Sequence, residues 1–319
     1  MEKTPAADRF VGIDVSKSWV DVHVRPDGIA FRCDSDLQGL AELVQRLRRF
    51  DPRLIVLEAS GGYESLPAVS LAEAGLPVAI VNPRQVRKFA EALGQLAKTD
   101  AIDARVIAHF AEAVRPPPRP MPDAAMTQLR ELLARRRQLL VMINAEKQRL
   151  AKAESTITQR SCKAMVKSLE AERERIGRAI DKLIKASPLW CAKLELLTSV
   201  PGVGDIVART LIAELPELGT VDRHQIAALA GVAPFSHDSG RRKGRRFVRA
   251  GRVRVRAPVY MACLVAIRHN AQLAAFYRRL RAAGKPARLA LVAVMRKLLT
   301  ILNAILRDRR PWRMLAGVA

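Results

Sequence analysis

Four acidic residues in the first third of the chain occupy positions from which carboxylates could act together. Asp14 interrupts an apolar run, where an unpaired carboxylate would be costly to bury. Glu58 ends a second apolar run, directly before a turn that contains two glycines. Asp100 and Asp103 are three residues apart at the start of a predicted helix, so both side chains can face the same way.

Carboxylates that converge repel one another unless a divalent cation lies between them. Hard oxygen ligands suit Mg²⁺ or Mn²⁺, and two such ions can support chemistry on phosphodiester bonds. Asp100 and Asp103 have a second explanation, since aspartate often caps the start of a helix. That explanation does not fit Asp14, which lies inside a predicted strand.

The elements around these residues predict an α/β domain over residues 1–115. Three strands in series are followed by alternating helices and strands, which describes a mixed sheet covered by helices. This order matches the ribonuclease H-like fold, in which the first and fourth strands are neighbours and the last helix packs across them. The four carboxylates would then converge. Strands are predicted over residues 10–15, 19–24, 29–33, 54–57 and 78–81, and helices over 37–47, 66–74, 86–93 and 102–113.

A proline-rich segment from Arg115 to Pro122 can neither continue a helix nor donate strand hydrogen bonds, and it predicts a domain boundary. Beyond it, apolar residues follow two heptad frames, which predicts a coiled-coil helical hairpin or dimer arm within residues 116–190. Residues 191–319 are predicted to form a compact helical domain. The seam residues are Met126, Leu129, Leu133, Leu140, Ile143 and Leu150 in the first frame and Val166, Leu169, Ile176, Ile180 and Leu183 in the second.

A short glycine-containing turn, Pro201-Gly202-Val203-Gly204, lies between two predicted helices. It is similar to the hairpin of a helix-hairpin-helix unit, in which small residues let backbone N–H groups approach a phosphate. Gly202 and Gly204 are therefore candidate nucleic-acid contacts. A Pro-Gly turn is also an ordinary connection between helices, and the sequence leaves both readings open.

The net charge of +24 is distributed unevenly along the chain. Residues 1–115 hold 15 Lys and Arg against 16 Asp and Glu, whereas residues 116–319 hold 40 against 15. An excess of that size in one part of a chain indicates a polyanionic partner. An anionic membrane fits less well, because the basic residues lie in loops as much as on helices.

The densest basic stretch surrounds Ser239. Between Ser239 and Arg256 there are nine Lys and Arg residues and no acidic residue, a composition suited to a nucleic-acid backbone. A serine hydroxyl held beside glycine and guanidinium groups could attack a phosphodiester. A serine before glycine is also a common turn residue, and Ser236 lies close by. The candidate nucleic-acid contacts here are Arg241, Arg242, Lys243, Arg245, Arg246 and Arg249.

Other features of the sequence restrict the class of protein to which the chain can belong. The four cysteines are scattered, which favours buried thiols in a reducing compartment over disulfides or a zinc site. The longest apolar stretches, 289–294 and 298–302, are broken by charge well short of a membrane span. The first residues carry no apolar core of a secretion signal. We therefore expect a cytoplasmic protein without a membrane partner.

Taken in order, these motifs resemble the DEDD transposases of the insertion-sequence 110 family across nearly the whole chain. No single motif is decisive, but their order and spacing together are specific. The first half contributes Gly12-Ile13-Asp14-Val15-Ser16-Lys17, Leu57-Glu58-Ala59-Ser60-Gly61-Gly62-Tyr63-Glu64 and Lys98-Thr99-Asp100-Ala101-Ile102-Asp103-Ala104. The second half contributes Pro201-Gly202-Val203-Gly204, Leu229-Ala230-Gly231-Val232-Ala233-Pro234, Asp238-Ser239-Gly240 and Tyr260-Met261-Ala262.

The resemblance implies a RuvC-like first domain whose catalytic and metal-binding set is Asp14, Glu58, Asp100 and Asp103, with Mg²⁺ or Mn²⁺ as cofactor. It implies that Ser239 forms a covalent link to DNA during excision and insertion of an insertion sequence. It further implies a homo-oligomer, a dimer or tetramer, whose active site combines domains of different subunits. By resemblance the partners are element-end and target DNA and a structured guide RNA, in a bacterial, nucleoid-associated setting.

Three other functions remain open from the residues alone. A nucleic-acid-binding protein without catalysis would not need Asp14 or Glu58. A metal-dependent junction nuclease would use the carboxylates and water, and Ser239 would be dispensable. A kinase or other ATPase of the actin-like type would need further glycine-rich phosphate loops, which the sequence does not contain, and would not require the basic second half.

Overall fold

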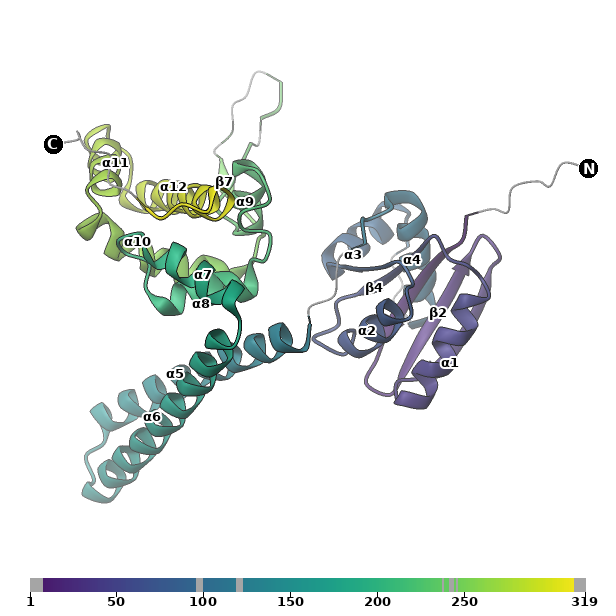
Figure 1. Cartoon of the computed structure of the whole chain (residues 1–319), viewed down its shortest axis with the longest axis horizontal. Coiled ribbons are helices and arrows are strands. Elements are labelled where there is room, and N and C mark those ends of the chain that lie inside the picture. The colour runs from purple at the N-terminus through teal and green to yellow at the C-terminus, as the bar shows by residue number, and fades with distance from the viewer. Residues whose placement is uncertain are drawn as a thin grey trace, which may run out of the picture. The chain divides into compact units, whose positions relative to one another are not determined.

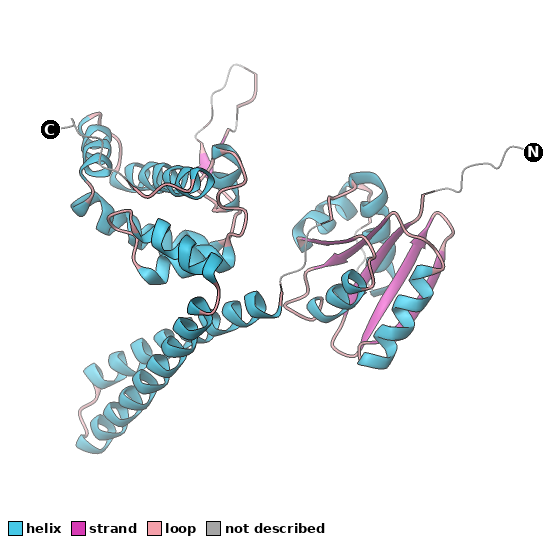
Figure 2. Cartoon of the chain, in the orientation of Figure 1, coloured by secondary structure: helices cyan, strands magenta, loops and turns pink. Residues whose placement is uncertain are grey.

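The computed structural model describes residues 8–95, 100–118, 123–236, 238–240, 244 and 246–312, with the backbone alone at 100–102. The chain divides into two compact units, Met1–Pro122 and Asp123–Ala319. The first unit contains a mixed sheet with helices, and the second is built almost entirely of helices (Figures 1 and 2). The predicted change from an α/β to a helical region along the chain is therefore confirmed, while the division into three parts stays a prediction.

The first unit is organised around a five-stranded sheet in the order β3-β2-β1-β4-β5. The first three strands are antiparallel neighbours, and β4 and β5 run parallel to β1. The first and fourth strands are adjacent, as the sequence predicts. The strands are β1 (Phe10–Val15), β2 (Trp19–Arg25), β3 (Ile29–Asp34), β4 (Leu54–Glu58) and β5 (Val78–Val81).

Strand alternation divides the side chains of this sheet between two helical layers. Val11, Ile13 and Val15 pack in a cluster with α1 (Leu37–Arg48) and α2 (Ser65–Glu73). Phe10, on the opposite face, packs in a second cluster with α3 (Pro83–Ala92) and α4 (Asp100–Val114). Because Gly12 and Asp14 alternate with the first set, both belong to the face that α3 and α4 cover.

Helix α4 crosses β1 at backbone contact distance. A Cβ atom at Gly12 would lie 2.1 Å from the amide nitrogen of Ala108 and 2.3 Å from the carbonyl oxygen of Ala104. No side chain larger than hydrogen fits there, so glycine at this position permits the crossing. The predicted packing of the last helix across β1 and β4 is confirmed.

The second unit begins with two long helices that pack against each other, α5 (Ala124–Lys152) and α6 (Thr156–Lys185). The heptad prediction is correct for several seam positions but wrong in detail, because Leu139 and Ile184 are buried while Leu140 and Leu183 are only half-buried. The buried position precedes the predicted one in α5 and follows it in α6, so the contacts of each helix, and not the repeat alone, decide which residue is buried. Coiled-coil packing of the pair stays a prediction.

Six further helices share a continuous core with residues 129–143 of α5 and 169–184 of α6. The buried Asn303 ties the last of them to a turn, since its Oδ1 accepts from Gly219 N at 2.7 Å and its Nδ2 donates to Val221 O at 2.8 Å. A two-stranded ribbon, which the sequence did not predict, closes the basic loop. These elements are α7 (Pro188–Thr198), α8 (Asp205–Glu214), α9 (Arg223–Leu229), β6 (Pro234–Phe235), β7 (Phe247–Val248), α10 (Val253–His269), α11 (Ala271–Ala282) and α12 (Ala287–Asp308).

Helix α12 is long and apolar enough, by length and composition, to cross a membrane, although its apolar stretches are each short. Half of its most apolar window is buried inside the unit, and Leu298, Leu299 and Leu302 are fully enclosed in the core. These contacts are those of a core helix. All four cysteines are unpaired, and burial raises the pKa of Cys263 to about 12.

The crossing at Gly12 generates a stability prediction. Gly12→Ala should lower the free energy of unfolding by about 2 kcal/mol or more, because the added methyl group must push α4 away from β1. Urea unfolding followed by circular dichroism measures this change. Gly177→Ala is the matched control, since Gly177 lies inside α6 with open space around it, and there alanine should be neutral or stabilising. Equal midpoints for the two variants would contradict the close crossing.

Candidate active site and nucleic-acid interface

The structure places Asp14 and Glu58 side by side at one end of the sheet. Strands β1 and β4 are parallel, with Ile13 opposite Leu57, so the next residue on each strand is a carboxylate. Neighbouring strands lie about 5 Å apart. Both side chains are half-buried, and both alternate onto the face covered by α4. The sequence-based pairing of these two residues is therefore reproduced by the register of the sheet.

Helix α4 brings Asp103 to the same face. Asp103 directly precedes Ala104, whose carbonyl oxygen lies against Gly12, two residues before Asp14 on β1. Asp103 is half-buried, and none of Asp14, Glu58 and Asp103 is isolated from other groups. Asp100 begins α4 one turn earlier, and its side chain lies outside the described residues.

These carboxylates share a face and an end of the sheet without forming a closed metal site. Within the described part of the chain, no three His, Cys, Asp or Glu side chains are grouped closely enough to hold an ion. The donor set itself, carboxylate oxygens from two adjacent strands and a helix, suits a hard divalent cation.

One further carboxylate, which was not predicted from the sequence, lies beside this group. Asp21 on β2 lies opposite Asp14 in the antiparallel register. Both of its oxygens accept from Arg32, Oδ1 from Nε at 2.8 Å and Oδ2 from Nη2 at 2.9 Å. The Arg32 guanidinium also lies over the ring of Trp19, 4.6 Å from its centroid. This pairing places a positive charge beside Asp21 and so limits repulsion between the neighbouring acids. The alternation of Trp19, Asp21 and His23 on one predicted strand could have indicated this residue.

The loop after Glu58 is held by a side chain within the same motif. One carboxylate oxygen of Glu64 accepts from the amide of Ser60 at 2.9 Å and from that of Gly62 at 2.8 Å. Gly61 and Gly62 have φ angles of +77° and +116°, which favour glycine and let both amides turn toward one oxygen. Glu64 thereby fixes the chain just beyond Glu58.

Ser239 lies in the loop between β6 and β7 and is exposed to solvent. Asp238 Oδ1 accepts from the Gly244 amide at 3.0 Å, which joins the two sides of this loop around the serine. Ser236 is exposed as well, so the geometry does not choose between them. Arg246 and Arg249 are exposed, whereas Arg241, Arg242, Lys243 and Arg245 lie outside the described residues.

The residues that follow this loop, 250–256, pack closely against the turn after α9 and are held by hydrogen bonds. A Cβ at Gly251 would lie 2.1 Å from the Gly231 amide nitrogen, so the two glycines pack backbone to backbone. Arg252 forms two 2.6 Å bonds to the carboxylate of Glu217. Arg256 donates to the Ala250 carbonyl at 3.0 Å. Two of the nine basic residues between Ser239 and Arg256 thus hold the loop in place.

The two glycines of the Pro201–Gly204 turn have different surroundings. A Cβ at Gly202 would lie 2.6 Å from Cβ of Ala266 on α10, so packing requires glycine there. Gly204 caps α8 and has open space around it, but Asp205 in the first turn forms an ion pair with Arg209. A carboxylate at that position disfavours a phosphate. These contacts favour a packing role for Gly202, and a phosphate contact at Gly204 stays a prediction.

Both halves of the chain match models of known protein families. A family model of DEDD transposases of the IS110 type, described as a transposase, matches residues 11–157. A second model, the transposase IS116/IS110/IS902 family, matches residues 194–278. This chain belongs to the IS110 family of transposases.

Several relatives support the assignment of this transposase to the family. It is 26% identical to the pilin gene-inverting protein of Moraxella lacunata over 95% of this chain and 97% of that protein. It is 36% identical to the insertion element IS900 uncharacterized 42 kDa protein of Mycobacterium paratuberculosis, over 36% of this chain and 29% of that protein. It is 30% identical to the insertion element IS110 uncharacterized 43.6 kDa protein of Streptomyces coelicolor, over 47% and 37% respectively.

The Glu64 contacts predict a positioning role in the transposase. Glu64→Ala releases the amides of Ser60 and Gly62, so the chain after Glu58 becomes less fixed and DNA cleavage should slow by about 10-fold or more. Glu64→Gln keeps an oxygen acceptor and should recover most of the rate. The measurement is the cleavage rate in the presence of Mg²⁺. Glu73→Ala, which removes an exposed carboxylate at the end of α2, is the control. A Gln variant as slow as the Ala variant would refute positioning through these hydrogen bonds.

Proposed function

We propose that this transposase cuts and rejoins DNA strands through a phosphoserine intermediate on Ser239, with the carboxylates of the first unit holding Mg²⁺ or Mn²⁺. The observation that carries the proposal is the placement of Asp14, Glu58 and Asp103 on one face at one end of the sheet. Their oxygens fit a divalent cation, which when bound would stabilise negative charge on the reacting phosphate. Asp100 is proposed as the fourth ligand. Residues 1–115, 116–190 and 191–319 would serve as metal-binding domain, arm and basic domain.

The covalent step balances as two transesterifications. The Ser239 oxygen attacks phosphorus, loses its proton and displaces one sugar oxygen, which leaves as a hydroxyl after protonation. A sugar hydroxyl of another strand end then attacks the phosphoserine, re-forms a diester and releases the serine. The number of phosphodiester bonds is conserved, so no external energy source is needed. Exposure of Ser239 on a loop allows a DNA strand to reach it.

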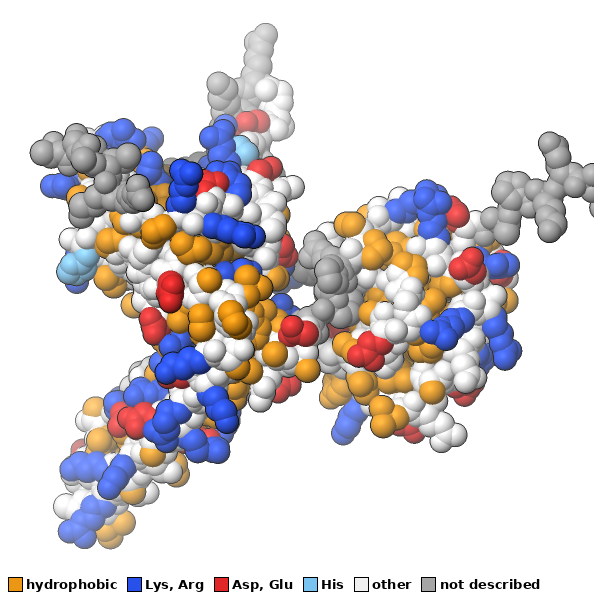
Figure 3. All heavy atoms as spheres, viewed as in Figure 1, with side chains coloured by type: hydrophobic (Ala, Val, Ile, Leu, Met, Phe, Trp, Pro, Cys, Tyr) orange, Lys and Arg blue, Asp and Glu red, His pale blue; other side chains and the backbone are white. Residues whose placement is uncertain are grey.

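Several partners follow from this proposal. The basic second unit would bind the element ends, the target DNA and a structured guide RNA, whose base pairing would supply specificity. In Figure 3, Lys and Arg side chains are numerous on the visible face of α5 and α6. The name of the Moraxella relative describes inversion of a gene, and inversion, excision and insertion all require cutting and rejoining. The setting would be the bacterial cytoplasm, where the nucleoid lies.

A covalent adduct tests the mechanism. Wild-type protein, incubated with Mg²⁺, element-end DNA and RNA from the element's flank, should yield a protein–DNA adduct that resists denaturant. Ser239→Ala should abolish the adduct because the nucleophile is gone, and Asp14→Asn should abolish it because a ligand is gone. Ser236→Ala is the matched control and should keep it. A metal-dependent nuclease would instead cleave without an adduct and survive Ser239→Ala, which would sink the serine mechanism.

Whether one active site uses two subunits is tested by mixing inactive variants. We expect Asp14→Asn and Ser239→Ala chains to recover part of the recombination activity when they are co-expressed. A mixed oligomer then contains one site with an intact carboxylate set from one chain and an intact serine from the other. If each site were built from one chain, every site in the mixture would carry a defect. A double variant carrying both substitutions, mixed with either single variant, is the control and should stay inactive.

A further inference from the structure

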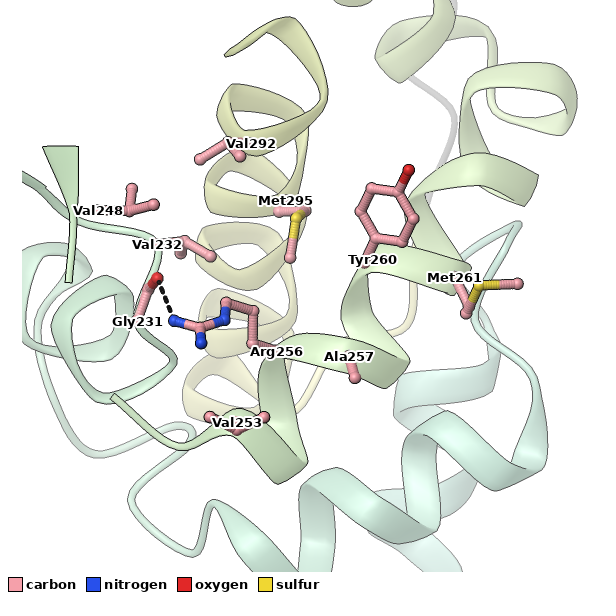
Figure 4. Close-up of a pocket in the computed structure, with 10 residues that line it drawn as sticks. All are labelled: Gly231, Val232, Val248, Val253, Arg256, Ala257, Tyr260, Met261, Val292 and Met295. Carbon is pink, nitrogen blue, oxygen red and sulfur yellow. Dashed lines mark hydrogen bonds between the residues drawn. The ribbon is translucent and has the colours of Figure 1, made fainter. Parts of the chain in front are cut away.

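An open apolar cavity lies at the base of the loop that carries Ser239. Its volume is about 420 Å³, within the range of ~300–1,000 Å³ typical of ligand sites. Helices α10 and α12, the turn after α9 and strand β7 line it (Figure 4). Because Tyr260 and Val253 on its rim are 39% and 61% exposed, it opens to solvent and is not a void in the core. The lining residues are Gly231, Val232, Val248, Val253, Arg256, Ala257, Tyr260, Met261, Val292 and Met295.

The cavity has one aromatic wall and one fixed cation. In Figure 4 the Tyr260 ring stands beside Met295, and the Arg256 side chain extends toward Gly231 on the other side of the hollow. Arg256 Nη1 donates to the carbonyls of Gly231 at 3.3 Å and Ala250 at 3.0 Å, so its guanidinium is held in place. Apart from Arg256 and the hydroxyl of Tyr260, the lining side chains are apolar. A flat ring with a polar edge would fit these walls better than an aliphatic chain.

The surroundings identify the charge of the occupant. The cavity adjoins β7, the outgoing strand of the basic loop, where Arg246 and Arg249 are exposed. Phe235 and Phe247 on the same ribbon are 44% and 54% exposed. Exposed aromatic and aliphatic side chains interleaved with arginines are typical of surfaces that bind single strands, with bases against rings and phosphates against cations. Aromatic residues, Met and Arg are also common at protein interfaces. The exposed arginines on both sides of β7 favour a polyanion over a protein surface.

We infer that this cavity receives an unstacked base of a single DNA strand, whose ring packs against Tyr260 while its phosphates contact the neighbouring arginines. This inference rests on the proposed function, because a strand being cut at Ser239 would run along this loop. The cavity would thus hold a nucleotide near the reacting phosphate. Such a contact tolerates different bases, since every base offers a flat face.

The test separates the contribution of the bases from that of the phosphates. Full-length protein, without divalent cations, is titrated with oligodeoxyuridine of about 16 nucleotides and with an abasic deoxyribose-phosphate strand of equal length and charge. Wild type should bind the base-containing strand roughly 5- to 150-fold more tightly, the range for stacking of one base on an aromatic side chain. Tyr260→Leu keeps apolar volume but lacks the ring, so it should bring the ratio of the two affinities close to one.

Two controls and a salt titration make the result specific. Tyr260→Phe keeps the ring and should keep the ratio. Val265→Leu changes another exposed apolar residue of α10 outside the cavity and should have no effect. The dependence of affinity on salt should be the same in all variants, because no phosphate contact changes. A shifted salt dependence or a lowered melting temperature in Tyr260→Leu would mark a structural effect and count against the inference.

The remaining outcomes each overturn the assignment. An unchanged ratio in Tyr260→Leu excludes base binding in the cavity. Tighter, Tyr260-dependent binding of oligouridine RNA than of its DNA counterpart would assign the cavity to RNA. If Tyr260→Leu changes the sedimentation of the free protein, the cavity would be assigned to contact with a second copy of the chain. The covalent adduct on Ser239 is measured in a separate experiment. If the adduct forms but strand binding does not depend on Tyr260, only this inference is wrong. If binding depends on Tyr260 but no adduct forms, only the proposed mechanism is wrong.

Discussion

The backbone contact between β1 and α4 at Gly12 is the constraint on which the first unit depends. It fixes the helix against the strand within a few ångströms, so residues one turn earlier on α4 and two residues later on β1 must occupy the same end of the sheet. Asp103 and Asp14 are those residues. Strand pairing then adds Glu58 from β4, and Arg32 offsets the extra charge of Asp21. The acids are brought together by packing of neutral groups, since their own repulsion opposes it.

A comparable backbone contact, between Gly231 and Gly251, seats the basic loop of the second unit. Arg252 and Arg256 strengthen this stem through a carboxylate and backbone carbonyls, whereas Arg246 and Arg249 remain exposed. The same residue type therefore serves two purposes within a few positions. A loop with like charges would otherwise repel itself, and bonds at its stem allow its charges to face outward.

The distribution of charge divides the work between the two units. A domain that concentrates carboxylates repels DNA by itself, and its balanced overall charge gives no long-range attraction. The basic second unit supplies that attraction, together with apolar side chains beside the loop that can contact bases.

The strands and helices of the first unit, the positions of the four acids and the basic character of the second half follow from the sequence, because they depend on local periodicity and composition. The adjacency of the first and fourth strands is predicted from the match of the element order to a known fold. Tertiary structure alone decided which residues meet. The pairing of Asp21 with Arg32 and the cavity beside Tyr260 join side chains of different elements, whose distances no local pattern encodes. Leu139 and Ile184 are buried where the heptad frame predicts Leu140 and Leu183, because burial depends on the helices that pack against each position.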